Sequence, residues 1–323
     1  MAGIMTIAKK ELLDIFSERK FLLIFGTLLI VVLVSTFQGA ISYSSSQSTT
    51  GMQIRGNMTQ LGGSGRAIVI GSAEGLSNTL SSMVTNFSLV GGVLALAISF
   101  DTINGERQTG SMKTLLSYPI YRDKIIYGKY LGGLIVVTIV SAITFLAGIG
   151  IFVGFSGLPM TGDTVMRLGL FFLISLVYMA IFLGVGLLLS IVMPQPSTSL
   201  LASMIVWLAS IRLIPNIGYA IAQIMYPVRM TFSGNTSGFS TPQGFDSIRT
   251  VISALSPSTT YEQIVNNILT TSRLQFSSGN IATVSISLEQ TLQTSAPYII
   301  YFAGLLIAIF AAAYFVFMRQ EIR

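Results

Sequence analysis

Residues 101–129 read DTINGERQTGSMKTLLSYPIYRDKIIYGK, and this charged segment lies between two apolar segments that could each cross a bilayer. It contains five basic and three acidic residues. Short loops on the cytoplasmic side of a membrane protein carry an excess of Lys and Arg. The pattern therefore indicates a cytoplasmic loop, which we interpret as a coupling element and not as a site of chemistry.

The composition of the whole chain indicates an integral membrane protein. Hydrophobic residues make up 52% of the 323 residues and charged residues only 9%, and the mean hydropathy is +0.75. So few polar side chains cannot cover a water-soluble globule. The net charge of +6 comes from residues beside apolar segments, without the basic stripes and interleaved aromatic residues of nucleic-acid-binding proteins. We therefore expect membrane lipid around the chain and no nucleic-acid partner.

Two chemically important residue types are missing, because the chain contains no Cys and no His. Without Cys, disulfides, thiolate nucleophiles and thiolate metal ligands are excluded. Without His, the commonest general base and metal ligand is absent. We therefore expect no catalytic residue and no metal site in this chain.

Apolar windows along the chain predict the membrane spans. A helix needs about 20 residues to cross the hydrocarbon core. The windows predict an all-α integral membrane protein with six transmembrane helices, at 21–43, 85–101, 125–155, 165–193, 199–226 and 297–318. The second window is short, and the fifth contains Arg212 and Pro215. In these two spans we expect a break, a tilt or a part outside the membrane.

Residues 1–20 are predicted to form a cytoplasmic interfacial helix that precedes the six-span domain, residues 21–323. Ile4, Ala8, Leu12 and Phe16 recur at helical spacing, with charged residues largely on other faces. This pattern is typical of a helix lying along the inner membrane surface. A frayed cytoplasmic tail is the alternative. We expect no cleaved signal peptide, because acidic residues precede an apolar window that is longer than a signal core.

The distribution of Lys and Arg predicts the orientation of the chain. Eleven of these residues fall within residues 1–20, residues 101–129 and the C-terminal tail. Six lie in the segments on the opposite side, which are longer and count less in the positive-inside rule. We therefore expect a multi-pass protein of the plasma membrane with both termini cytoplasmic. The uncharged link PQPSTS, residues 194–199, is then a cytoplasmic turn.

Two polar loops, residues 44–84 and 227–296, are predicted to lie outside the cytoplasm, the larger between spans five and six. Glycosylation sequons occur at Asn57, Asn86 and Asn235, but ordinary polar loops produce such matches as often. Within the larger loop, a helix is predicted to start at Ser256-Pro257 or at Ser258. Its apolar positions, Ile264, Ile268 and Leu269, favour a half-buried helix at the outer membrane face.

The charged segment also holds a fixed order of residues: Glu106-Arg107, Gly110-Ser111, Leu115-Leu116-Ser117, Pro119-Ile120, Arg122, Ile126 and Gly128-Lys129. This order resembles the pattern E-R-x-x-G-[ST]-x-x-x-L-L-S-x-P-I-x-R of the ABC-2 type permease family, the membrane subunits of ATP-binding-cassette transporters. Met112 departs from it, since the family often has leucine there. Lys10-Glu11-Leu12 and Leu255-Ser256-Pro257 also resemble what such permeases carry at those places.

The resemblance implies a six-span permease subunit that pairs with a second permease subunit, either the same or a related chain. It also implies two separate cytoplasmic ATPase subunits that bind ATP and Mg²⁺, so this chain would carry no cofactor. The chain has no Walker A sequence, because its Gly128-Lys129 pair is followed by Tyr130. Members of the family are mostly exporters, so we expect an exporter with no enzyme activity in this chain.

The residues expected to couple to the ATPase lie between the second and third spans. Gly110 is suited to end or to start a helix, and Ser111 to cap the segment that follows. Leu115 and Leu116 supply an apolar ridge for a groove on a partner, and Pro119 forces a break before the next helix. The complete set is Glu106, Arg107, Gly110, Ser111, Lys113, Leu115, Leu116, Pro119 and Arg122. The alternative is that Glu106, Arg107 and Lys113 merely solvate a loop.

An ion-coupled secondary transporter or channel is the competing class. Such proteins usually carry ionisable groups inside the membrane, whereas the predicted spans contain no Asp or Glu in their interiors. Arg212 is the candidate charge at depth, and we interpret it as an interfacial or pore-facing residue. An intramembrane protease is excluded, because the spans contain no catalytic pair. The apolar spans suit a lipid-like, peptide or other amphiphilic cargo, but helix packing in lipid requires the same residues.

Overall fold

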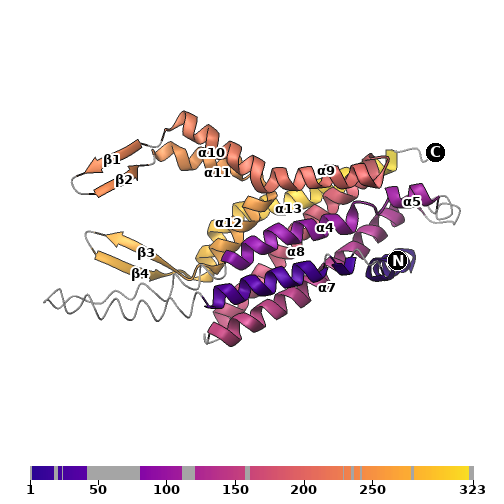
Figure 1. Ribbon diagram of the computed structural model, residues 1–323, viewed down its shortest axis with the longest axis horizontal. Coiled ribbons are helices and arrows are strands. Elements are labelled where there is room, and N and C mark those ends of the chain that lie inside the picture. The colour runs from indigo at the N-terminus through magenta and orange to yellow at the C-terminus, as the bar shows by residue number, and fades with distance from the viewer. Residues whose placement is uncertain are drawn as a thin grey trace.

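The structure is a bundle of long helices with two β-hairpins at one end (Figure 1). It is a computed structural model of the full chain, and it describes residues 2–17, 21–23, 25–41, 81–110, 121–156, 161–227, 229–233, 236–240, 242–277 and 280–319. The hairpins mark the left end in Figure 1. Helix α1 (Ala2–Ser17), helix α5 (Asn104–Thr109) and the end of helix α13 (Leu288–Arg319) lie at the right end.

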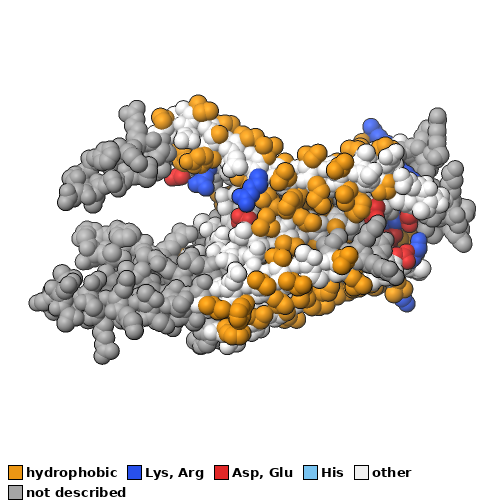
Figure 2. Space-filling model, in the orientation of Figure 1, with side chains coloured by type: hydrophobic (Ala, Val, Ile, Leu, Met, Phe, Trp, Pro, Cys, Tyr) orange, Lys and Arg blue, Asp and Glu red, His pale blue; other side chains and the backbone are white. Residues whose placement is uncertain are grey.

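Six helices in the described part of the chain are long and apolar enough to cross a membrane. They are Phe21–Ile41, Ser81–Thr109, Asp123–Phe155, Gly162–Val192, Pro196–Met225 and Leu288–Arg319. Each coincides with a predicted window, which confirms six candidate spans. The last helix begins before residue 297, so that Pro297 lies inside it. Figure 2 shows hydrophobic side chains along the bundle and several charged side chains at the end that holds α5, with others over the middle and toward the hairpin end.

Both spans that were expected to be irregular contain a turn of π-helix. The second span consists of η1 (Phe87–Gly91), α4 (Gly92–Ser99), a turn and α5. The fifth consists of α9 (Pro196–Leu208), η2 (Ala209–Leu213) and α10 (Ile214–Met225). Arg212 lies in η2, and Pro215 lies in the first turn of α10, which continues directly from η2. Proline has no N–H to donate to the preceding turn, so the regular helix hydrogen bonding is interrupted there. The break predicted at these residues is therefore a local change of helix type.

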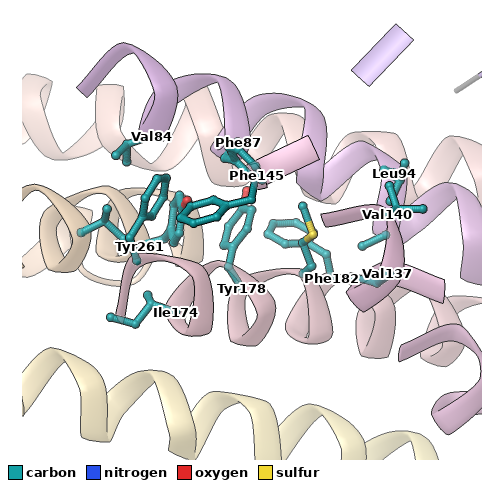
Figure 3. Close-up of a cluster of buried hydrophobic side chains, with 14 of the residues drawn as sticks. Val84, Phe87, Leu94, Val137, Val140, Phe145, Ile174, Tyr178, Phe182 and Tyr261 are labelled. Carbon is teal, nitrogen blue, oxygen red and sulfur yellow. The ribbon is translucent and has the colours of Figure 1, made fainter. Parts of the chain in front are cut away.

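Helix α8 (Gly162–Val192) is the centre of the bundle and packs against α4, α7 (Arg122–Ser156), α13 and α12 (Pro257–Leu269). Its aromatic residues lie in the buried cluster of Figure 3. Tyr178 stacks on Tyr261 of α12 with ring centroids 4.5 Å apart, and it meets Phe182 edge-on at 5.0 Å. Buried aromatic pairs add to the area that they remove from solvent or lipid. This cluster fixes α12 against the middle of α8.

Helix α12 confirms the predicted start, because the Ser256 Oγ accepts a hydrogen bond from the Thr259 N–H at 3.2 Å. Ile264, Ile268 and Leu269 are buried, but the helix does not rest on the outside of the bundle as expected. Ser258, at its start, contacts Tyr178 near the middle of α8, and the Ile268 carbonyl, near its end, contacts Arg167 near the start of α8. Helix α12 is therefore inserted along half the length of α8.

The segment between spans five and six also contains strands, which the all-α prediction did not include. Strands β1 (Arg229–Ser233) and β2 (Thr236–Ser240) form one antiparallel hairpin, in which Arg229 is opposite Ser240. Strands β3 (Ser272–Ser277) and β4 (Asn280–Ser285) form another, in which Ser272 is opposite Ser285. Helix α11 (Gln243–Ser253) follows β2 and packs on α10. The membrane-spanning part of the described chain is helical throughout.

Candidate functional site

Helix α5 carries the first residues of the predicted coupling set, and the end of α8 holds it in place. The Ser190 Oγ accepts hydrogen bonds from the backbone N–H groups of Ile103 at 2.9 Å and Asn104 at 3.2 Å. Arg107 Nη1 donates to the Ile191 carbonyl at 3.1 Å. Hydroxyls that accept from the first N–H groups of a helix fix its start. The position of α5 is therefore set by a neighbouring span.

Gly110 ends α5 as predicted. Its φ is +75°, in the left-handed region, and its N–H donates to the Arg107 carbonyl at 3.3 Å. Glycine adopts this conformation without the steric cost that a side chain would bring. The chain leaves α5 sharply at this point, and Ser111, Lys113, Leu115, Leu116 and Pro119 lie outside the described residues. The backbone of Arg122 begins α7.

Glu106 joins an ion-pair cluster that the sequence analysis did not foresee. Lys129 Nζ of α7 lies 2.5 Å from Glu11 Oε1 of α1 and 3.0 Å from Glu106 Oε1 of α5. It also donates to the Thr102 carbonyl at 3.0 Å. An ammonium group has three donors, and all three have a partner here. We name Glu11, Glu106 and Lys129 the Lys129 cluster.

The Lys129 cluster is buried, which makes it specific to one arrangement of the helices. The exposed fraction of the side chain is 1% for Lys129, 12% for Glu11 and 17% for Glu106. At such burial the desolvation cost offsets much of the attraction, but removal of one partner leaves an uncompensated charge. Lys10 lies 3.7 Å from Glu106 at the more exposed side. The cluster therefore ties α1, α5 and α7 together.

Close packing of α1 on α7 brings Glu11 to Lys129. Gly132, one turn after Lys129, faces α1 so closely that a Cβ atom there would lie 2.8 Å from the Glu11 Cβ and 3.2 Å from the Ala8 carbonyl oxygen. Glu11 and Lys129 are 118 residues apart in the chain. Their sequence signal is weak: each is a charged residue within an otherwise apolar helical face. No pattern in one sequence pairs them.

A second polar region lies where the two π-helical turns meet the start of α12. Tyr178 Oη donates to the Ser88 carbonyl of η1 at 2.7 Å, and it lies 3.1 Å from the Ser258 Oγ. The Ser258 Oγ is 2.8 Å from the Ser210 Oγ of η2. π-Helical turns inside α-helices are frequent at functional sites. Hydroxyl groups therefore connect the second, fourth and fifth spans through α12.

Arg212 lies on the outer side of this region, with an exposed side chain. Its positive charge interacts with Glu262 of α12. Burial raises the pKa of the Glu262 carboxyl above its ordinary value, and this effect exceeds the opposing effect of Arg212. The interiors of the predicted spans contain no Asp or Glu. The packing of α12 on η2 brings the Glu262 carboxylate beside the fifth span from another element.

Arg167 anchors the opposite end of the inserted helix. This buried residue of α8 donates to Asp163 at 2.7 Å and to the carbonyl groups of Ile268 at 2.6 Å and Ile286 at 2.8 Å. The planar guanidinium can hold several acceptors in fixed directions. The end of α12 and the strand pair β3–β4 are therefore fastened to the start of the fourth span.

Comparison with protein families identifies the chain. The family model described as "ABC-2 family transporter protein" matches residues 5–322. The comparison with curated proteins found no match. The match spans nearly the whole chain and includes all six candidate helices. Members of this family are membrane permeases without catalytic activity of their own. The chain therefore belongs to the ABC-2 family of transporter membrane proteins.

Proposed function

We propose that this chain is the permease subunit of an ABC exporter, driven by two cytoplasmic ATPase subunits that contact the segment 101–129. The observation that carries the proposal is the Lys129 cluster, which ties α5 to α1 and α7. Glu106, a residue of the predicted coupling set, is a member of this cluster. A displacement of α5 would therefore act on both α1 and α7.

The second connection of α5 leads to α8. Arg107 donates to the Ile191 carbonyl, and Ser190 accepts from the start of α5. Adjacent residues of the pattern thus face different spans: Glu106 faces the third, and Arg107 faces the fourth. Packed helices respond to a displacement by discrete rearrangement and not by continuous deformation. Glu106 and Arg107 therefore connect α5 to two different spans.

ATP and Mg²⁺ belong to the partner ATPase subunits in this proposal. The second permease subunit, the same or a related chain, supplies the other wall of the path. Large apolar side chains are exposed on the first and fifth spans, among them Leu23, Ile30, Leu201 and Ile205. Such surfaces suit lipid or a second permease subunit. Arg212 lies in η2 and Glu262 in α12, and in this proposal neither belongs to the coupling route.

The orientation in this proposal places α5 and both termini in the cytoplasm of a cell whose plasma membrane holds the protein. Two observations support it. The start of α1, α5 and the end of α13 lie at one end of the bundle (Figure 1). Eleven Lys and Arg residues of the sequence fall in the segments at or adjoining that end.

Crosslinking from single cysteines tests the coupling contact. The chain has no Cys, so Thr109→Cys at the exposed end of α5 and Asp246→Cys on the exposed face of α11 each give one reactive site. In native membranes we expect a bifunctional reagent at Thr109 to capture a protein with a P-loop nucleotide site, and the same reagent at Asp246 to capture none. Capture from both positions, or from neither, contradicts the proposal.

Transport by the reconstituted complex distinguishes the competing class. The Arg212–Glu262 interaction is the observation that favours an ion-coupled carrier or channel. We expect the permease alone to be inert in liposomes. We also expect transport by the complete complex to require ATP and to continue when ionophores collapse the proton and sodium gradients. If the permease alone transports cargo on an ion gradient, the proposed ABC exporter function is wrong and the chain is a secondary transporter.

A further inference from the structure

A cavity of about 720 Å³ opens at the α5 end of the bundle. Its wall is apolar and comes from three spans: Phe21 of the first, Leu94 and Ala97 of the second, and Leu200 and Met204 of the fifth. Residues of helices α1 and α5 and of the turn before α5 complete its lining. A space of this size falls in the range of small-molecule sites, which are mostly apolar with a few placed polar groups.

The polar groups of this cavity are mainly acidic. Glu11, Asp14, Asp101 and Glu106 line it, and Lys129 is the single basic residue among its described lining residues. Lys129 already has three partners, two of them carboxylates. Lys10 lies at the edge, 3.7 Å from Glu106 and 3.9 Å from Asp14. With Lys10 counted, acidic groups still outnumber basic groups.

We infer that this cavity binds organic cations with an apolar body, and that such compounds are the class of cargo taken up from the inner side. The assignment as cargo rests on the proposed exporter function, whereas binding itself does not. The apolar wall accepts the body of the compound, and the acidic end favours a positive charge. An anion of the same shape meets more carboxylates than ammonium groups among the described residues of the site. In a partly desolvated space, salt screens the resulting repulsion only weakly.

The site is also connected to the coupling element. Glu11 and Glu106 line the cavity and pair with Lys129 at the same time. A bound cation therefore competes with Lys129 for these two carboxylates. Because Glu106 belongs to α5, occupancy of the cavity changes the contacts that hold α5 against α1 and α7. A ligand that interacts differently with two arrangements shifts the balance between them.

Binding of an isosteric pair of ions tests the inference without any ATPase. Tetraphenylphosphonium and tetraphenylborate have nearly the same shape and opposite charge. With purified permease in nanodiscs, we expect saturable binding of tetraphenylphosphonium and no saturable binding of tetraphenylborate above empty nanodiscs. Saturable binding of both ions, or of neither, overturns the inference.

Substitutions then locate the site. Asp101→Asn removes one charge from the rim, and we expect it to weaken tetraphenylphosphonium binding about three- to fivefold, as for loss of a partly screened charge. Asp101→Glu should retain most of the affinity. Asp246→Asn makes the same charge change on an exposed face at the opposite end of the bundle and should have no effect. Equal effects of Asp101→Asn and Asp246→Asn would place the binding elsewhere.

A steric variant separates the apolar wall from the charge. Ala97→Phe fills the space beside Leu94 and should reduce saturable binding at least tenfold, because it removes volume that the rings of the cation would occupy. Unchanged binding by this variant would contradict the site.

Failure of the Thr109 crosslink with intact cation binding would overturn the coupling proposal alone. Capture of the ATPase without cation binding would overturn the cargo class alone.

Discussion

Lys129 is the residue on which three helices of this permease converge. Its ammonium lies between Glu11, Glu106 and the Thr102 carbonyl, almost without exposure. A salt bridge at this depth adds little stability in itself, because both charges lose their water. Its effect is selective: only one placement of α1 and α5 satisfies all three donors. This selectivity suits a contact that must hold α1, α5 and α7 in fixed relative positions when α5 is displaced.

Loss of the Lys129 charge is expected to destabilise the inner end of the bundle. In Lys129→Met the Glu11 carboxylate loses its buried cation, while Glu106 keeps the exposed Lys10 at 3.7 Å, so unfolding should become easier by about 3 kcal/mol. Glu106→Gln in the same chain removes one of these charges and should restore part of the loss. The measurement is denaturant unfolding in detergent micelles for both variants and the wild type.

Lys124→Met is the matched control for this prediction. It makes the same substitution on α7, where Lys124 Nζ lies 5.0 Å from the centre of the exposed Tyr121 ring. We expect a change below about 1 kcal/mol. Equal destabilisation by Lys124→Met and Lys129→Met, or a lack of any rescue by Glu106→Gln, would contradict the role given to the cluster.

At the scale of elements, glycine allows α1 to approach α7. The two helices pack over Gly132, where a Cβ atom would lie 2.8 Å from the Glu11 Cβ. A contact below 3.0 Å requires the helices to move apart. Glycine lowers the stability of a helix interior by about 0.5–1 kcal/mol relative to alanine. Gly132 therefore lowers the stability of α7 itself but allows the axes of α1 and α7 to lie close together.

Alanine substitutions at two glycines of α7 should therefore have opposite effects. At Gly150 a Cβ atom would meet no atom within 4 Å, so Gly150→Ala should raise the melting temperature or leave it unchanged. At Gly132 overpacking should cost about 1–3 kcal/mol and exceed that gain. We expect Gly132→Ala to lower the melting temperature and to increase protease access to α1. The same sign of effect at both glycines would argue against the close contact.

For the whole molecule, the arrangement of the ends makes a prediction of topology. Single cysteines at Ser197 and near either terminus should be protected from a membrane-impermeant thiol reagent in intact cells. Cysteines at Ser46 and Gly238 should be labelled, because both positions fall in the predicted outer loops. Labelling at Ser197 together with protection at Gly238 would invert the last three segments and overturn the six-span orientation.

The sequence by itself determined the membrane class, the six candidate spans and the family. A helix needs about 20 apolar residues to cross the hydrocarbon core of a membrane, so each span can be recognised from a continuous stretch of sequence. It also located the irregular spans and the two helix termini at Gly110 and Ser256, because capping is a local property. The coupling role of the complete segment 101–129 stays a prediction, since residues 111–120 lie outside the described chain.

The tertiary structure decided what depends on distance in space. Nothing local pairs Glu11 with Lys129, inserts α12 beside α8, or brings Glu262 to Arg212, because each contact joins residues far apart in the chain. The two hairpins were missed because their strands are short. Met230 and Phe232 alternate with polar residues, as do Leu274 and Phe276, but two apolar positions per strand are a weak signal. The cavity likewise exists only where three spans and α1 meet. Periodicity along one helix reports which face is apolar, whereas packing decides what that face meets.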